Sequence, residues 1–305
     1  MKHSVKITSL LLVMYLITQF IGLAVVGTYQ PEVKETVIGN QTVNVTTYNL
    51  PYGTDPPETT SPKLNLVSIL IAMLTGVIVI LLLMKIKAEV FFRIWFFLVI
   101  ILALGISINS LFINIKHGAI ISLIIALPLA LIKVFQKNII VHNLTELIIY
   151  PGIASIFVPL LSLWTVSILL ILISLYDMYA VWHSGFMQKM AKYQIQKVRV
   201  FSGFFVPYIG NKERQLLEKS KGKNIAKKMK VHVAILGGGD IVFPIILAGV
   251  VLNIFGLIPA IIISLGATAA LGGLFLLSEK GKFYPAMPFI STGCFIALGL
   301  VYLIF

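Results

Sequence analysis

The sequence predicts an all-α polytopic membrane protein with nine transmembrane helices. Hydrophobic residues make up 58% of the 305-residue chain and charged residues only 11%, and the mean hydropathy is +0.99. A water-soluble globule of this composition would lack polar surface. Because the apolar stretches are continuous rather than alternating, and because unpaired backbone is not tolerated in hydrocarbon, we expect spanning helices rather than the strands of a barrel.

Nine apolar runs have about the length that a helix needs to cross a bilayer, roughly 20 residues. They lie at Ile7–Val26, Leu64–Met84, Ile94–Phe112, Ala119–Phe135, Val141–Leu160, Leu161–Val181, Val231–Phe255, Pro259–Leu277 and Phe283–Ile304. The fourth run is short, and only an apolar stretch around Pro159 divides the fifth from the sixth. We therefore expect an N-terminal six-helix bundle (1–183), a basic loop (184–230) and a three-helix C-terminal part (231–305).

The basic residues predict the surroundings and the orientation of the chain. The net charge is +13, but all except one of the 24 Lys and Arg residues fall between the apolar runs, and twelve of them lie in 184–230. This distribution favours the headgroups of a lipid bilayer over nucleic acid as the partner. With a cytoplasmic N-terminus, 21 basic residues lie inside and three outside, or nine and three without the long loop. The positive-inside rule thus predicts a multi-pass cell membrane protein with a cytoplasmic 184–230 loop and an outside C-terminus.

Ionisable side chains inside the predicted spans are the strongest candidates for chemistry, because each costs at least ~2.5–3.5 kcal/mol in hydrocarbon. Asp177 closes the sixth run and Asp240 lies well within the seventh. Glu146 begins the fifth run, which suggests an interfacial or helix N-terminal acid. The sixth and seventh helices are consecutive and antiparallel, so Asp177 and Asp240 can meet in the cytoplasmic half of the bilayer.

A pair of carboxyl groups in a site of low dielectric constant cannot ionise twice cheaply, so it tends to share one proton. The ionised partner can then take a proton from a water molecule that attacks an amide carbonyl, while the neutral partner donates to the carbonyl oxygen. This is the chemistry of an aspartic protease. On the aspartates alone, two other interpretations stay open: polar packing between helices, and an ion or proton pathway.

Three successive glycines, Gly237, Gly238 and Gly239, directly precede Asp240. They are poor helix formers, at about 1 kcal/mol each relative to alanine, and they remove side-chain bulk beside the acid. The sequence suggests either close packing between helices or the approach of a substrate backbone to the carboxylate.

Three short motifs together resemble one known family. Tyr176-Asp177 is similar to a YD motif, Gly237–Asp240 is similar to a GxGD motif, and Pro285–Met287 is similar to a PAL motif with Met in place of Leu. The motifs occur in this order on the sixth, seventh and ninth predicted spans. The chain thus resembles the presenilin and signal peptide peptidase family of GxGD intramembrane aspartyl proteases. It is most similar to a microbial, archaeal-type presenilin homologue.

The resemblance implies cleavage of transmembrane polypeptide substrates, with Asp177 and Asp240 as the catalytic residues. It also implies that the remaining motif residues bind substrate or shape the site, namely Tyr176, Gly237, Gly238, Gly239, Pro285, Ala286 and Met287. Because Pro285 interrupts regular structure, we expect nearby backbone groups to pair with an extended substrate. No cofactor is implied, a homo-oligomer is compatible with the resemblance, and accessory subunits are left open.

The main alternative function is an ion or proton transporter, which would also use intramembrane acids. A transporter predicts related halves with paired broken helices, and the sequence shows no internal repeat of that kind. Other protease classes lack their sequence signatures. The five histidines form no HExxH arrangement, so no metal site is predicted, and no GxSxG motif stands on a predicted span.

Overall fold

The computed structural model describes residues 5–38, 41–55, 67–68, 70–72, 74–76, 78–79, 82, 89–136, 138–184, 202–209, 231–278 and 284–305. Within these residues, eight helices are long and apolar enough to cross a membrane. They are α1 (Val5–Thr28), α3 (Glu89–Asn109), α4 (Gly118–Phe135), α5 (Ile139–Phe157), α6 (Leu163–Tyr179), α9 (Gly238–Phe255), α10 (Leu257–Leu277) and α11 (Met287–Ile304). The second predicted span, Leu64–Met84, lies largely outside the described residues, and the residues described there are helical. The prediction of a helical polytopic membrane fold is confirmed.

The fifth and sixth predicted spans are separate helices that meet at Pro159. A short 3-10 turn, Val158–Leu160, follows α5, because proline lacks the N–H that would continue the helix. Helix α6 then starts with a capping box. The Ser162 hydroxyl accepts a hydrogen bond from the Thr165 N–H, and the Thr165 hydroxyl accepts one from the Ser162 N–H.

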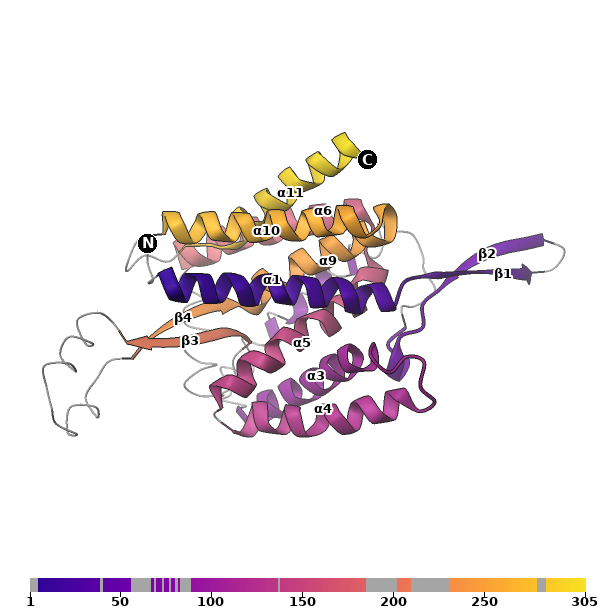
Figure 1. Cartoon of the computed structure of the whole chain (residues 1–305), viewed down its shortest axis with the longest axis horizontal. Helices are drawn as coiled ribbons and strands as arrows, with labels where there is room; N and C mark the ends of the chain where they lie inside the picture. Colours follow the sequence, from indigo (N-terminus) through magenta and orange to yellow (C-terminus); the bar gives the residue numbers. More distant parts are fainter. Residues whose placement is uncertain are drawn as a thin grey trace, which may run out of the picture.

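Helix α9 lies at the centre of the bundle. It packs against α1, α5, α6, α10 and α11, and its residues from Ile241 to Leu252 are almost all buried. On one side of this centre α3 and α4 pack together beside α5, and on the other side α10 packs along α11 (Figure 1). Since Asp240 lies in the first turn of α9, the bundle surrounds the helix that carries one of the two candidate acids.

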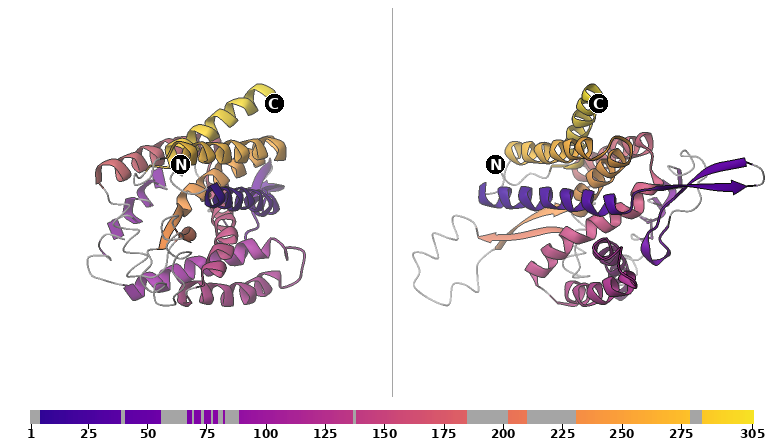
Figure 2. Two further views of the ribbon diagram at one scale, coloured as in Figure 1. Left: turned by 60° about the vertical axis from the view of Figure 1, so that its left-hand side comes forward. Right: turned by 45° about the vertical axis from the view of Figure 1, so that its right-hand side comes forward.

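Two β-hairpins extend from opposite ends of the bundle (Figures 1 and 2), and the sequence analysis predicts neither. Strand β1 (Glu32–Ile38) pairs antiparallel with β2 (Gln41–Thr47). At the other end β3 (Gly203–Ile209) pairs antiparallel with β4 (Val231–Gly237). The second hairpin brings part of the predicted basic loop directly against the start of α9.

The predicted helix Val231–Phe255 is wrong over its first seven residues. Those residues form β4, and the helix starts only at Gly238. β-branched side chains at alternate positions of this segment favour a strand, and the three glycines that follow disfavour a helix. Asp240 consequently lies at the N-terminal end of α9 rather than deep within a helix.

The ninth helix also starts later than the sequence suggests. Helix α11 begins at Met287 rather than at Phe283, and Pro285 precedes it in an irregular segment. This agrees with the bias of proline against a helical conformation in the residue before it. The first backbone N–H groups of α11 are therefore available to a partner outside the helix.

Glu146 is buried in the bundle about two turns into α5, so its interpretation as a helix N-terminal acid is wrong. Its side chain is 1% exposed, and its Oε1 atom lies 2.5 Å from Nζ of Lys133 in α4 and 3.7 Å from Nε2 of His142. Lys133 lies in the last turn of α4 and is buried as well. The ion pair joins α4 to α5 near the end at which β3 and β4 also lie.

We expect Lys133→Met to lower the free energy of unfolding by about 3–5 kcal/mol, because it leaves the Glu146 carboxylate buried without its counter-ion. The double variant Lys133→Met/Glu146→Gln removes that uncompensated charge and keeps an acceptor for neighbouring donors. It should therefore be more stable than the single variant. Thermal unfolding in detergent measures both, and a double variant no more stable than Lys133→Met would contradict the expectation.

Candidate active site

Asp177 lies in the last turn of α6 and is held by the N-terminus of α11. Its side chain is 4% exposed, and Oδ2 accepts a hydrogen bond of 3.1 Å from the N–H of Met287. The backbone N–H of Ala286 also donates to this carboxyl group. The first N–H groups of a helix have no partner within it and carry a partial positive charge, so they favour a carboxylate.

Asp240 lies in the first turn of α9 and is held by its own helix N-terminus. Gly237 is the N-cap residue of α9, and its N–H donates to the Asp240 carboxyl group three residues later. This is the backward half of a capping box, with Asp in the place that Glu or Gln usually occupies. As a whole residue Asp240 is half-buried.

The structure brings the two candidate acids together. Helices α6 and α9 pack against each other and both contact α11, and the charge of Asp177 acts on the carboxyl group of Asp240. A pair in this position is costly to ionise twice, because the surroundings are largely apolar side chains. Such a pair can provide a general base and a general acid at the same time.

The three glycines before Asp240 differ in their surroundings. A Cβ atom on Gly238 would lie 2.8 Å from the Tyr150 ring and from Oγ of Ser202, so this glycine is required for close packing. A Cβ atom on Gly239 would make only ordinary contacts with Phe243, and one on Gly237 would lie 3.2 Å from Oδ2 of Asp240. Packing therefore explains Gly238, close approach to the Asp240 carboxyl group explains Gly237, and only the position of Gly239 would accept a Cβ atom with ordinary contacts.

The remaining predicted site residues lie near the acids in different ways. Met287 and Ala286 contact Asp177 through their backbone N–H groups, and Pro285 is buried just before them. The expectation that backbone groups near Pro285 are free for a substrate therefore needs correction, because Asp177 already uses the Met287 N–H. Tyr176 is 38% exposed on the surface of α6, directly before Asp177.

Two polar residues of α1 lie close to the site, and the sequence analysis missed both. Gln19 is fully buried, and its Nε2 donates to the carbonyl oxygen of Ile241, the residue after Asp240. One turn earlier, Tyr15 is fully buried, and it interacts electrostatically with Asp240. Their four-residue spacing puts both on the same face of a helix. A polar pair at this spacing inside an apolar span is the signal that would have identified them.

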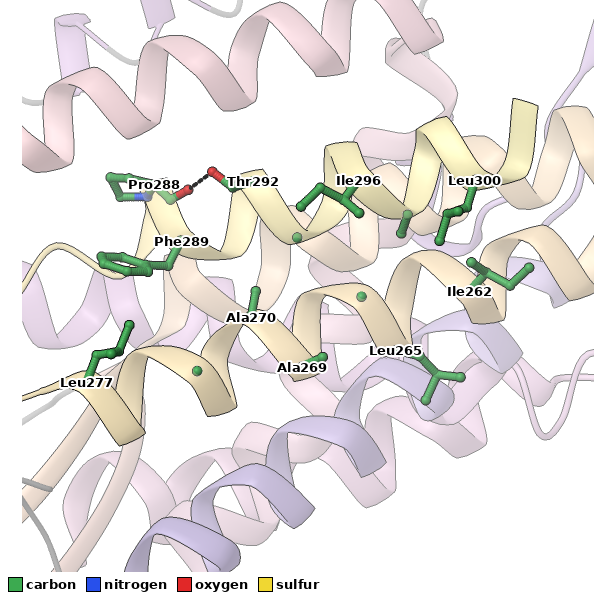
Figure 3. Close-up of a pocket in the computed structure, with 14 residues that line it drawn as sticks. Ile262, Leu265, Ala269, Ala270, Leu277, Pro288, Phe289, Thr292, Ile296 and Leu300 are labelled. Atoms are coloured by element: carbon green, nitrogen blue, oxygen red, sulfur yellow. Dashed lines mark hydrogen bonds between the residues drawn. The ribbon is translucent and has the colours of Figure 1, made fainter. Parts of the chain in front are cut away.

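A hydrophobic groove of about 800 Å³ lies between α10 and α11 (Figure 3). It starts beside Pro288 and Phe289, near the segment that holds Asp177, and continues along α11 to Leu300. None of the fourteen residues that line it is ionisable, so the groove offers shape and apolar contact but no chemistry. Among the described residues no cluster of three or more His, Cys, Asp or Glu side chains could hold a metal ion.

Residues 43–305 match the model of the family described as "Signal-peptide peptidase, presenilin aspartyl protease". The chain belongs to this family. A solved structure described as a presenilin family intramembrane aspartate protease in a C222 space group is 16% identical, with a TM-score of 0.62. The match covers 98% of this chain and 99% of that one. A second, in a P2 space group, is 17% identical over 97% of both chains, with a TM-score of 0.60. No curated protein sequence matches the chain.

Membership of the presenilin and signal peptide peptidase family confirms the predicted reaction class. The chain is an intramembrane aspartic protease with the multi-pass fold of that family. The alternative of an ion or proton transporter finds no support in these comparisons. At 16–17% identity the solved structures establish the shared fold, and the roles of individual residues depend on the geometry described above.

We expect Gly238→Ala to destabilise this presenilin-family protein by about 1–3 kcal/mol, because the added methyl group overpacks against the buried Tyr150 ring. Cleavage should fall with it, because α9 carries Asp240 two residues later. Gly273→Ala in α10 is the matched control, since nothing lies within 4 Å of its Cβ position, and it should be neutral or slightly stabilising. Thermal unfolding and peptide cleavage would compare the two. Equal effects at both positions would show that the tight contact at Gly238 is unimportant.

Proposed function

We propose that Asp177 and Asp240 are the catalytic dyad with which this protein hydrolyses peptide bonds in transmembrane polypeptides. The observation that carries the proposal is their shared environment. The two acids come from neighbouring antiparallel helices, interact electrostatically, and are each held by backbone N–H groups of a helix N-terminus. Two acids fixed in this way inside an apolar bundle need a function that repays the cost of burying them.

The reaction follows from one proton on the pair. The ionised carboxylate takes a proton from water as its oxygen bonds to the substrate carbonyl carbon, and the neutral carboxyl group donates to the carbonyl oxygen. The resulting tetrahedral intermediate then breaks its carbon–nitrogen bond, and a proton from the dyad passes to the departing amine. Each partner therefore changes protonation state during the reaction, which requires that neither be locked in a permanent ion pair.

The substrate has to be extended where it is cut, because helical amides are closed off by intrahelical hydrogen bonds. Strand β4 ends at Gly237, directly before the turn that carries Asp240. Within the described residues its only strand partner is β3, so one edge of β4 is available to a third strand. Addition of an extended substrate segment to that edge would carry its backbone toward the two carboxyl groups.

We place the site on the cytoplasmic side of a cell membrane. The β3–β4 hairpin lies at the end of the bundle at which α1 starts, and the β1–β2 hairpin lies at the opposite end (Figure 1). The distribution of Lys and Arg favours a cytoplasmic position for the first of these ends. The active site, the N-terminus and the 184–230 loop then share one side, and the C-terminus lies outside.

Asp177→Asn and Asp240→Asn should each reduce cleavage of a single-pass model peptide to background, because either change removes one half of the acid–base pair. Asp55→Asn is the control, since Asp55 hydrogen-bonds the Leu50 N–H in a turn far from the bundle centre. Purified protein in vesicles, with products identified by mass spectrometry, measures this. Full activity in either site variant would rule out the dyad. Proton or ion flux that requires both acids, without peptide products, would instead favour a transporter.

The rate should show a bell-shaped dependence on pH. Below the working range both carboxyl groups are protonated and no general base remains, and above it both are ionised and no general acid remains. Initial cleavage rates of the same peptide across a wide pH range, with thermal unfolding recorded at each value, would test this. A rate that does not change with pH over a range in which the fold is stable would contradict the shared-proton mechanism.

A further inference from the structure

One side chain of α5 takes the place of a neighbouring strand beside β3. Nδ2 of Asn143 donates to the carbonyl oxygen of Phe205 at 2.9 Å, and Oδ1 of Asn143 accepts from the Phe205 N–H at 3.0 Å. A side-chain amide thus pairs with both backbone groups of one strand residue, as an adjacent strand would. The sequence analysis assigns no function to Asn143.

A second side chain of α5 continues the same contact. Nε2 of His142 hydrogen-bonds the carbonyl oxygen of Gly203 at 2.9 Å, and Nζ of Lys133 lies 3.3 Å from His142 Nδ1. If Lys133 donates to Nδ1 of His142, the imidazole hydrogen is on Nε2. The Nε2–H group then donates to the carbonyl oxygen of Gly203. Gly203, Phe205 and Pro207 are alternate residues of β3, and Pro207 has no N–H to leave unpaired on that side. The outer edge of β3 is therefore occupied by side chains of α5.

This contact determines which edge of the hairpin is open. Opposite residues in an antiparallel pair alternate between those that hydrogen-bond each other and those whose backbone groups point away from each other. Phe205 is opposite Ile235, and Gly203 is opposite Gly237. Because the backbone groups of Phe205 bond Asn143, those of Ile235 point to the other side, away from β3. The Gly237 N–H, which donates to Asp240, points to that same side.

The contact of Asn143 and His142 with β3 belongs to a part of the bundle that several other interactions hold in place. Helix α5 is joined to α4 by the Lys133–Glu146 pair. Its Tyr150 packs edge-on against the fully buried Phe204 of β3, with ring centroids 6.2 Å apart, and closes against Gly238. Helix α5 therefore contacts both β3 and the turn that carries Asp240.

We infer that Asn143, assisted by His142, is a positioning residue that closes the edge of β3 and thereby directs an extended substrate to the edge of β4, beside Asp240. The inference rests on the proposed dyad and on strand addition as the way in which substrate binds. In this role Asn143 determines which peptide bond of the substrate lies at the dyad, and it takes no part in the chemistry of cleavage. Without the amide, β3 can shift along β4 or accept a strand itself, and the substrate backbone then meets the dyad at other peptide bonds.

The test uses Asn143→Ala in the full-length protein, reconstituted in phosphatidylcholine vesicles with a single-pass model peptide. We expect KM to rise several-fold with a smaller change in kcat, and mass spectrometry should detect cleavage at neighbouring bonds that the unaltered protein does not cut. A purely structural role would lower the amount of active protein without moving the cleavage position. Asn143→Gln keeps the amide on a longer arm and should restore part of the original cleavage pattern.

Asn138→Ala is the matched control. Asn138 is also an asparagine of α5, and its Oδ1 accepts from the N–H groups of Ile140 and Val141 as the helix cap. Its removal weakens the helix cap but leaves β3 untouched. It should therefore lower the unfolding temperature without changing the cleavage positions. If both asparagine variants changed KM and cleavage positions alike, loss of α5 stability would explain the result and the inference would be wrong.

Phe205→Pro tests the same contact from the strand side, and it serves if Asn143→Ala does not fold. Compared with Phe205→Ala, which also loses the half-buried ring but keeps the N–H, it removes the N–H that bonds Asn143. The N–H at this position does not face β4, and Pro207 already shows that this side of β3 tolerates proline. Altered cleavage positions would support the inference, and cleavage at the original bonds with unchanged KM would overturn it. Failure of the unaltered protein to cleave the peptide at all would instead refute the proposed function.

Discussion

The structure depends on how two carboxyl groups are supported inside an apolar bundle. A charged side chain in this environment needs either a counter-ion or fixed dipoles. Asp177 and Asp240 receive backbone N–H groups at the starts of α11 and α9, whereas Glu146 receives a lysine. The difference matters for chemistry. Backbone dipoles carry only partial charges, so they support a carboxyl group that gains and loses a proton during each turnover.

This way of supporting the acids explains why helices start where they do. If α9 continued back through Val231, as the sequence suggests, its first turn would lie far from Asp240 and the Gly237 N–H would be used inside the helix. If α11 began at Phe283, the Met287 N–H would bond a carbonyl of its own helix. The glycines before Asp240 and the proline before Met287 prevent both outcomes. Residues that look like breaks in two spans therefore create the two anion-favouring ends that the site requires.

The sequence predicted the acids and the spans better than the details between them. Asp177, Asp240 and the apolar runs are readable because a buried acid and a run of about 20 apolar residues each have one simple physical meaning. The strand β4 was misread, because its apolar residues continue into those of α9 and together resemble one span, although the alternating β-branched residues and the glycines after them favour a strand. Asn143 was missed, because its partner is the backbone of a distant segment and sequence spacing carries no information about such a contact, whereas the spacing of Gln19 from Tyr15 was a signal that was not used.

The two edges of the β3–β4 hairpin differ in how their backbone N–H and C=O groups are paired, and the membrane makes this difference important. An open strand edge is excluded from lipid, because each unpaired backbone group there costs several kcal/mol. The edge of β3 avoids this cost through Asn143 and His142. Among the described contacts of the β4 edge, the Gly237 N–H has a side-chain partner, the Asp240 carboxyl group, and the backbone groups of Ile235 remain for water or a bound chain. The edge of β4 can therefore bind either a substrate strand or water, and hydrolysis beside Asp240 needs a substrate and a water molecule.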